Sequence, residues 1–377
     1  MAFVIENVLW KGECRTLAVK NGTFVEPCSV HDCETLDAQG CLGLPGFVNS
    51  HLHLDKSLLM ERCEYIDVPG PEKGRLTREQ KTGMTKKDIK TRASRVMDEA
   101  VSTGNLVLRT NVDIDPLVGL NGVEALLELK GEYADRVSLQ VVPFAQEGFE
   151  KFSGVYDLLL EAMKLNVDGI GGHTSIDSDG RTHINNILDL AERFGCGADF
   201  HVDEKAQPDD FLLPYLADAV KQRGMQGKIN AIHCSSLAVV DEARADRCLE
   251  QVAEAQIRVI VCPTAMATRP VAPVKQLRKH GIHILIGSDN IGDFFNPLGS
   301  TSMPQMALLL AYNQRLFTAE ELDFLWTTVT SGGISLIGTG DLLGSQANLT
   351  LVAACSVRDA LRNNAPVVLN MRGGVIV

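Results

Sequence analysis

Strand-like apolar runs alternate with helical segments through the middle of this chain, and this alternation restricts the fold more than any other feature. Such alternation is typical of βαβ units and a parallel sheet. Eight such units predict an α/β fold in which the sheet closes into a (β/α)8 TIM-like barrel. The eight predicted strands are residues 46–54, 106–114, 137–145, 167–174, 195–203, 228–234, 257–263 and 282–290.

The two ends of the chain have a different pattern, with short β segments in place of the alternation. The first contains TLAVKNGTFV, where Asn21-Gly22 between apolar flanks predicts a hairpin, and the last contains APVVLNMRGGVIV. We expect residues 1–43 and 347–377 to form a small β-sandwich domain and residues 44–346 to form the barrel. Residues 55–105 carry a Gly/Pro-rich loop, VPGPEKG, before their helix, and should lie over the barrel mouth.

Composition narrows the functional class. The chain has 377 residues, 45% of them hydrophobic and 22% charged, as in ordinary globular proteins. A net charge of -12 argues against nucleic acid or an anionic membrane as a partner. The basic stretch from Lys81 to Arg95 is interpreted as a solvated helix face. Ten cysteines without a CxxC pair, and an N-terminus without a signal-peptide pattern, predict a soluble cytoplasmic protein.

Titratable residues end several predicted strands, where barrel enzymes place their active sites. His51 and His53 end the first strand, and their spacing of two puts both imidazoles on one side, within reach of one ion at about 2.0–2.1 Å. An HxH pair also arises by chance, and a lone histidine is more often a core residue. The pair therefore needs support from other strand ends.

That support comes from three later strands. The fifth ends at His201-Val-Asp-Glu204, the sixth at His233 and the eighth at Gly287-Ser-Asp289. An aspartate in this position can instead cap the helix that follows. We favour the capping interpretation for Asp203 and a metal-binding one for Asp289.

The order of the motifs resembles the cytosine deaminase branch of the amidohydrolase superfamily. The motifs are PGFVNSHLHLDKS, LRTNVDI, VVPFAQEG, FHVDEKAQ, IHCSSL, VCPT and GSDNIGDFFNPLG. The resemblance runs over nearly the whole chain and implies a barrel with a β-sandwich built from both termini. It also implies one divalent metal ion, Zn or Fe(II), with Mn also suited to the ligands. The fourth strand, VDGIGGHT, lacks the lysine that bridges two metals in binuclear relatives.

The same resemblance implies residue roles. His51, His53, His201 and Asp289 would be the metal ligands, and the cation would lower the pKa of a bound water from 15.7 toward about 7. Glu204 would move protons from water to a ring nitrogen and to the leaving ammonia, and Asp289 would also accept a proton. His233 would stabilise the developing oxygen.

The resemblance also implies which residues would contact the substrate. Gln146 matches a glutamine that contacts the amide edge of the substrate. Asp293, Phe294 and Phe295 would line the pocket, with an aromatic wall for a flat ring. The neighbouring Asn290 stands where cytosine deaminases tend to have a second aspartate.

Three further side chains lie near strand ends. Asp55, Lys56 and His173 are each as suited to support the ligands as to contact substrate.

Two departures move the substrate away from cytosine. Asn111 replaces a histidine common in relatives, and DNIGDF is similar to the branch that hydrolyses amino-triazines such as N-isopropylammelide. That branch has a different motif where the fifth strand of this chain ends in HVDE, whereas this chain keeps the glutamate of that motif, Glu204.

The leading hypothesis is hydrolytic deamination of an amino-substituted N-heterocycle, namely a cytosine-like, amino-triazine-like or related cyclic amidine substrate. A second hypothesis is cleavage of a ring amide or removal of an alkylamine. A third, from another class, is a ligand-binding protein with a degenerate metal site. The expected partner is a small N-heterocyclic molecule. Most relatives associate, which allows a homo-oligomer, although no segment specifies an interface.

Overall fold

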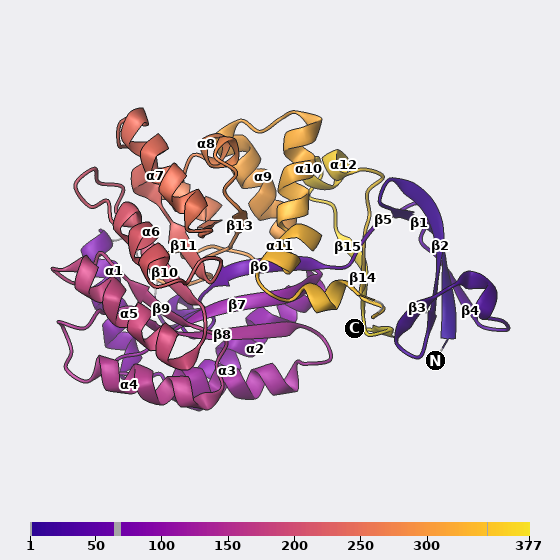
Figure 1. Cartoon of the computed structure of the whole chain (residues 1–377). Helices are drawn as coiled ribbons and strands as arrows, with labels where there is room; N and C mark the ends of the chain where they lie inside the picture. The colour runs from indigo at the N-terminus through magenta and orange to yellow at the C-terminus, as the bar shows by residue number, and fades with distance from the viewer. Residues whose placement is uncertain (1, 64–68, 345) are drawn as a thin grey trace.

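A parallel sheet of eight strands forms the centre of the computed structural model, which describes residues 2–63, 69–344 and 346–377. Its strands follow one another around the sheet in chain order, each parallel to the next (Figure 1). This arrangement confirms the predicted barrel fold. The strands are β6 (Phe47–Leu52), β7 (Asn105–Asp113), β8 (Ser138–Ala145), β9 (Ile170–His173), β10 (Ala198–Val202), β11 (Ile229–His233), β12 (Arg258–Val261) and β13 (Ile284–Ile286).

Contacts between the first and last strands bring the sheet close to a complete ring. A parallel bridge pairs Leu52 with Asp289, and the Asp289 amide donates to the His51 carbonyl at 3.0 Å. The strands are almost wholly buried, as expected for a parallel sheet covered by helices. The carboxyl ends of all the strands consequently meet at one rim.

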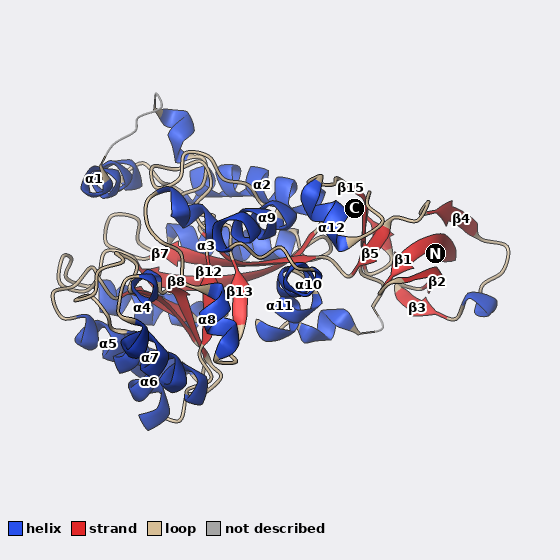
Figure 2. Cartoon of the chain, turned by 90° about the horizontal axis from the view of Figure 1, so that it is seen from above, coloured by secondary structure: helices blue, strands red, loops and turns tan. Residues whose placement is uncertain are grey.

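Helices cover the outside of the barrel (Figure 2). In α5, Asp179 caps the first turn by accepting from two backbone amides, and Gly195 ends the helix with φ of 66°. In α10, Thr318 and Glu321 form a capping box. The helices are α1 (Gly70–Lys81), α2 (Lys86–Ser102), α3 (Asn121–Glu132), α4 (Val155–Ala162), α5 (Gly180–Phe194), α6 (Leu213–Gln222), α7 (Glu242–Glu254), α8 (Val274–Lys279), α9 (Met303–Gln314), α10 (Ala319–Thr328), α11 (Ser331–Leu336) and α12 (Val357–Arg362).

The two ends of the chain build a second, mixed sheet beside the barrel (Figure 1). Asn21 and Gly22 connect β2 to β3 with φ of 54° and 80°, which is the predicted two-residue hairpin. The C-terminal strand β14 pairs with β5 near the N-terminus. The sheet contains β1 (Ala2–Trp10), β2 (Glu13–Lys20), β3 (Thr23–Val25), β4 (Glu34–Asp37), β5 (Leu42–Leu44), β14 (Leu349–Val352), β15 (Val367–Arg372) and β16 (Val375–Ile376). The division at residues 43 and 347 stays a prediction.

Two sequence predictions about the segment after β6 are wrong. Most of the Gly/Pro-rich stretch is helical, because α1 begins at Gly70 and proline is tolerated in a first helical turn; residue 68 lies outside the described residues. Lys81 does not belong to a solvated face: its side chain is fully buried, and its Nζ lies 2.8 Å from Asp113 and 2.6 Å from Asp115. Paired carboxylates allow this lysine to be buried. They also fix the end of α1 to the barrel.

A polar layer crosses the barrel interior below the rim. Arg109 on β7 donates to both carboxylate oxygens of Asp199 on β10, at 2.8 and 2.9 Å, and Asn230 on β11 donates to the same carboxylate at 2.7 Å. Asp199 precedes His201 by two residues, so both side chains point to the same face of β10. The ion pair therefore lies directly beneath a predicted site residue.

Among the described residues, none of the helices combines the length and apolar character needed to cross a lipid bilayer. All ten cysteines are free thiols in the structure.

Candidate active site

Three strand ends bring the four predicted metal ligands together at one rim of the barrel. His51 lies in β6 and His53 directly follows it, His201 lies in β10, and Asp289 follows β13. The three histidines each offer a ring nitrogen, and these atoms all lie within 4.8 Å of one another. The Asp289 Oδ1 atom is 3.4 Å from His51 Nε2 and 3.5 Å from His53 Nε2.

Asp289 reaches this position because the backbones of β6 and β13 approach closely. A side chain on Gly287 would place its Cβ only 2.6 Å from that of His51, so this position requires glycine. The Asp289 backbone then turns into the left-handed region with φ of 64°, which is unfavourable for a non-glycine residue. His233, at the end of β11, adopts the same conformation with φ of 71°. Strained backbone at two strand ends of the same rim is typical of a functional site.

Asn111, on β7, fixes the orientation of two imidazoles. Its side-chain oxygen lies 2.7 Å from His51 Nδ1, and its backbone carbonyl lies 3.1 Å from His53 Nδ1. Because a carbonyl only accepts, both Nδ1 atoms carry the proton, and both Nε2 atoms present a lone pair to the cluster. The sequence comparison marks Asn111 only as a departure from the relatives. Its contacts indicate that it supports the ligands.

The electrostatic environment also favours the protonation states in which these side chains can bind a metal. Burial lowers the pKa of His201 far below its ordinary value, and neighbouring imidazoles lower it further. Burial and the charge on Lys56 have the same effect on the pKa of His53. For Asp289, burial opposes ionisation, but the surrounding imidazoles outweigh it and lower the pKa. His53 and His201 are thus held as neutral imidazoles beside the Asp289 carboxylate.

This donor set fits a divalent cation. Two ligand atoms that share a cation at about 2.1 Å lie roughly 3.0–3.4 Å apart, close to the separations from Asp289 to His51 and His53. His201 is 3% exposed, yet neither of its ring nitrogens has a hydrogen-bond partner among the described residues. Buried polar nitrogens normally have partners, and a metal ion would satisfy one of them.

Glu204 lies two residues beyond β10, and both of its carboxylate oxygens are held. His173, at the end of β9, lies 2.8 Å from Oε2, and Arg269 Nη2 lies 2.6 Å from Oε1. Burial raises the pKa of Glu204, but the charges of Arg269 and His233, together with His173, lower it well below its ordinary value. The sequence analysis did not identify Arg269, because no motif includes it.

His233 faces Glu204 across the cluster, with Nε2 3.8 Å from Oε1. On its other side, Arg269 Nη2 lies 3.4 Å from Nδ1. An arginine only donates, so Nδ1 accepts and Nε2 carries the proton that points toward Glu204. Burial lowers the pKa of His233 to about 4, which keeps the ring neutral.

Gln146 and Lys56 form another part of the rim. The Lys56 ammonium donates to Gln146 Oε1 at 3.0 Å and to Asp113 at 2.8 Å. It also lies 5.9 Å from the ring centroid of Phe144 and 5.8 Å from that of Phe295. Since Lys56 occupies the Gln146 oxygen, the amide NH2 is the group that Gln146 can direct to a ligand.

Asp293 organises the turn after β13. Its Oδ1 accepts from the amides of Phe295 at 2.9 Å and Asn296 at 3.0 Å, while its Oδ2 accepts from Asn290 Nδ2 at 2.5 Å. Burial raises its pKa to about 6. Phe295 is partly exposed, whereas Phe294 is buried in an apolar cluster beneath the turn.

Asp203 and Cys262 also lie just beyond strand ends. Asp203 accepts from the amides of Leu212 and Leu213, at 2.6 and 3.1 Å, at the start of α6. This agrees with its capping interpretation, although α6 begins ten residues after Asp203 itself. Cys262, after β12, lies in a second cluster of potential metal ligands with His51 and His233.

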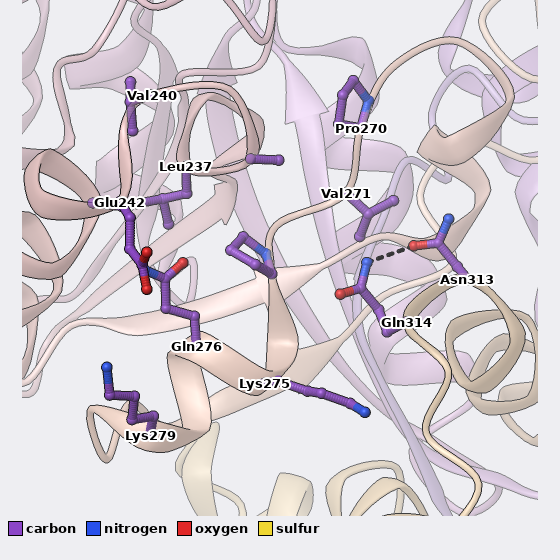
Figure 3. A pocket seen from close by; sticks show the side chains of 13 residues that line it. Leu237, Val240, Glu242, Pro270, Val271, Lys275, Gln276, Lys279, Asn313 and Gln314 are labelled. Atoms are coloured by element: carbon purple, nitrogen blue, oxygen red, sulfur yellow. Dashed lines mark hydrogen bonds between the residues drawn. The ribbon is translucent and has the colours of Figure 1, made fainter.

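A separate hollow of about 730 Å³ lies beside the loop that carries Arg269. Pro270, Val271, Gln276 and Asn313 lie on its wall (Figure 3). The described residues that line it include none of the site residues predicted from the sequence. The chemistry-bearing cluster is therefore at the barrel rim and not in this hollow.

Comparison with known proteins gives consistent results. The model of the amidohydrolase family matches residues 73–303. N-isopropylammelide isopropyl amidohydrolase from Pseudomonas sp. (strain ADP) is 28% identical over 360 residues, which is 91% of this chain and 88% of the relative. Pterin deaminase from Rhizobium rhizogenes is 25% identical over 82% of this chain and 74% of the relative.

Among solved structures, 5-methylcytosine deaminase from Klebsiella pneumoniae liganded with phosphonocytosine superimposes with a TM-score of 0.90 and 26% identity. The match covers 100% of this chain and 98% of the other. Both the barrel and the terminal sheet thus belong to a shared architecture.

Proposed function

The chain belongs to the amidohydrolase family and is a hydrolase of C–N bonds, and from that premise we propose that it deaminates an amino-substituted nitrogen heterocycle and releases ammonia. The substrate would be cytosine-like, amino-triazine-like or a related cyclic amidine. One observation carries the proposal: the histidine and aspartate cluster lies beside a carboxylate, Glu204, that is held at both oxygens.

The family is metal-dependent, and we infer that His51, His53, His201 and Asp289 would hold one divalent cation. The candidates are Zn and Fe(II), with Mn as a third, because imidazole and carboxylate ligands suit all of them. When bound, such a cation acidifies water, lowering its pKa from 15.7 toward about 7, so that a nucleophile is available at neutral pH. Asn111 would support this function by keeping the Nε2 lone pairs of His51 and His53 directed at the cation.

Glu204 would move the protons of the reaction. The oxygen of a water molecule forms a bond to the amidine carbon, and a Glu204 oxygen takes the proton that the water loses. Glu204 delivers that proton to the ring nitrogen. The added hydroxyl then loses its remaining proton, which Asp289 would accept and pass on to the amino nitrogen, so that the C–N bond breaks, ammonia leaves and the added oxygen becomes a ring carbonyl. His233, through the proton on Nε2, would donate a hydrogen bond to the oxygen on which charge develops.

Other rim residues would position the substrate. Gln146 would donate its amide NH2 to a ring carbonyl, since its oxygen is occupied by Lys56. Phe295 would contact the flat face of the ring. Asp293 and Asn290 would hold the turn that carries Phe295 and shape that end of the pocket.

Ammonia release across a panel of aminopyrimidines, amino-triazines, pterins and creatinine-type amidines tests this proposal, with enzyme loaded separately with Zn, Fe(II) and Mn. We expect Glu204→Gln to reduce turnover by about 10²–10⁴-fold without loss of metal, the usual contribution of acid–base catalysis. Glu250→Gln, the same change on an exposed part of α7, is the matched control. Full activity of the Glu204 variant, or no turnover with any substrate and metal, would contradict the proposal.

A second candidate reaction is removal of an alkylamine from a substituted ring, or cleavage of a ring amide. It is favoured by the 28% identity to the isopropyl amidohydrolase. Mass spectrometry separates the reactions: deamination exchanges NH for O, amine removal releases the alkylamine, and ring opening adds one water.

A further inference from the structure

We propose that Arg269 forms a subsite for an anionic oxygen of the substrate, and that the substrate therefore carries a carboxylate or an ionised ring hydroxyl. This inference rests on the proposed function and narrows its substrate class. Arg269 follows the short helical turn Pro263–Ala267 after β12, so the same rim of the barrel that holds the cluster also holds this guanidinium.

The position of the guanidinium supports a ligand-binding role. Its Nη2 lies 2.6 Å from Glu204 Oε1 and 3.4 Å from His233 Nδ1, which places the positive charge among the groups assigned to proton transfer. The side chain is 20% exposed, so a dissolved ligand can reach it. Its Nε is buried and has no hydrogen-bond partner among the described residues. The guanidinium therefore has donor capacity that its present contacts do not use.

The pairing with Glu204 opposes the function of Glu204. A carboxylate that accepts a charge-assisted hydrogen bond at 2.6 Å is held in its ionised form, whereas proton transfer requires it to take up a proton. An anionic oxygen of the substrate would replace Glu204 as the partner of Arg269. Substrate binding would then release the carboxylate at the moment when it must act.

Arg269 is the better candidate of the two cations identified at the rim. Lys56 is 1% exposed and already donates to Asp113 and Gln146. Arg269 instead pairs with a carboxylate that is itself partly exposed at the mouth. Because the chain carries a net charge of -12, an anion entering the mouth also needs a local positive charge to offset the overall repulsion. A planar guanidinium binds a carboxylate through two parallel hydrogen bonds and a single ionised oxygen through one.

Calorimetric binding to zinc-loaded full-length protein tests the proposal with three related rings: uracil, orotate and barbiturate. Uracil is neutral, orotate adds a carboxylate, and barbiturate has an ionised ring oxygen. We expect at least one anion to bind the wild-type protein about 10- to 100-fold more tightly than uracil, the range for hydrogen bonds to a charged group. Preference for orotate alone identifies a carboxylate, and preference for barbiturate alone identifies a ring oxygen.

The variants identify the residue responsible. Arg269→Gln should abolish the preference for the anion while changing uracil binding less than about threefold. Arg269→Lys keeps the charge and should retain part of it. Arg15→Gln, which removes an exposed charge from β2, is the matched control. Zinc content and melting temperature establish that each variant is folded. If Arg269→Gln is not folded, Arg269→Lys is used for the test in its place.

Equal weakening of uracil and the anions by Arg269→Gln would overturn the inference, because it would indicate that Arg269 only positions Glu204. Absence of any anion preference in the wild type would also overturn it. Ammonia release with no role for Arg269 in anion binding would leave the proposed deaminase intact. Anion binding through Arg269 without turnover of any heterocycle would instead contradict the proposed deamination.

Discussion

Replacement of Asn111 by leucine should weaken metal binding without removing a metal ligand. The side-chain oxygen of Asn111 lies 2.7 Å from His51 Nδ1 in a fully buried environment. Leucine has nearly the same size but cannot accept a hydrogen bond, so it leaves a buried N–H without a partner, at a cost of about 1–3 kcal/mol. It also removes the preference for the tautomer in which His51 Nε2 is free to bind a cation. Loss of such a support typically reduces metal affinity by about 10- to 100-fold.

The backbone carbonyl of Asn111 remains after the substitution, so the contact to His53 should persist. Competition with a calibrated zinc chelator measures the affinity, and nitrogen-15 chemical shifts of the imidazoles report the tautomers. Asn185→Leu is the matched control, because Asn185 on α5 bonds only Tyr215 and Arg223 and none of the predicted metal ligands among the described residues. Zinc affinity of Asn111→Leu equal to that of the wild type and the control would refute this reasoning.

Three further predictions concern buried charges. Asp199→Ala should reduce the free energy of unfolding by about 3–5 kcal/mol, because Arg109 is left buried and unpaired; chemical denaturation measures this loss, and a loss below about 1 kcal/mol would contradict it. Lys81→Met should destabilise by a similar amount, whereas Lys86→Met on the exposed face of α2 should have little effect, and equal denaturation midpoints would contradict the burial of Lys81. Asp293 has a pKa raised to about 6, so its proton is held more tightly in the folded state, and its contribution to the free energy of unfolding should fall by about 2–3 kcal/mol as pH rises from about 4 to 6. Asp293→Asn should remove that pH dependence. Parallel profiles of unfolding free energy against pH for the wild type and the variant would contradict this prediction.

The sequence was sufficient to predict the barrel, and it placed the candidate site residues at strand ends. Strand periodicity is a local property, and each predicted strand contains or overlaps a strand of the structure. The carboxyl ends of parallel strands meet at one rim, so placing His51, His53, His201 and Asp289 at strand ends predicted that they would be neighbours.

Side-chain pairing could not be predicted in the same way, because it depends on distances between residues far apart in the chain. Arg269 contacts Glu204 across more than sixty residues, and no motif joins them. Lys81 was assigned to a solvated face because lysines usually are exposed, whereas two carboxylates on another segment make its burial tolerable. The contacts of Asn111 depend on the register between β6 and β7, which the sequence pattern does not specify.

Anomalous diffraction from crystals of protein purified with Zn, recorded at the zinc absorption edge, tests the proposed metal site. We expect one anomalous peak per chain, about 2.0–2.2 Å from nitrogens of His51, His53 and His201 and from a carboxylate oxygen of Asp289. Absence of such a peak after zinc loading, or zinc bound elsewhere in the chain, would contradict the assignment of these four ligands.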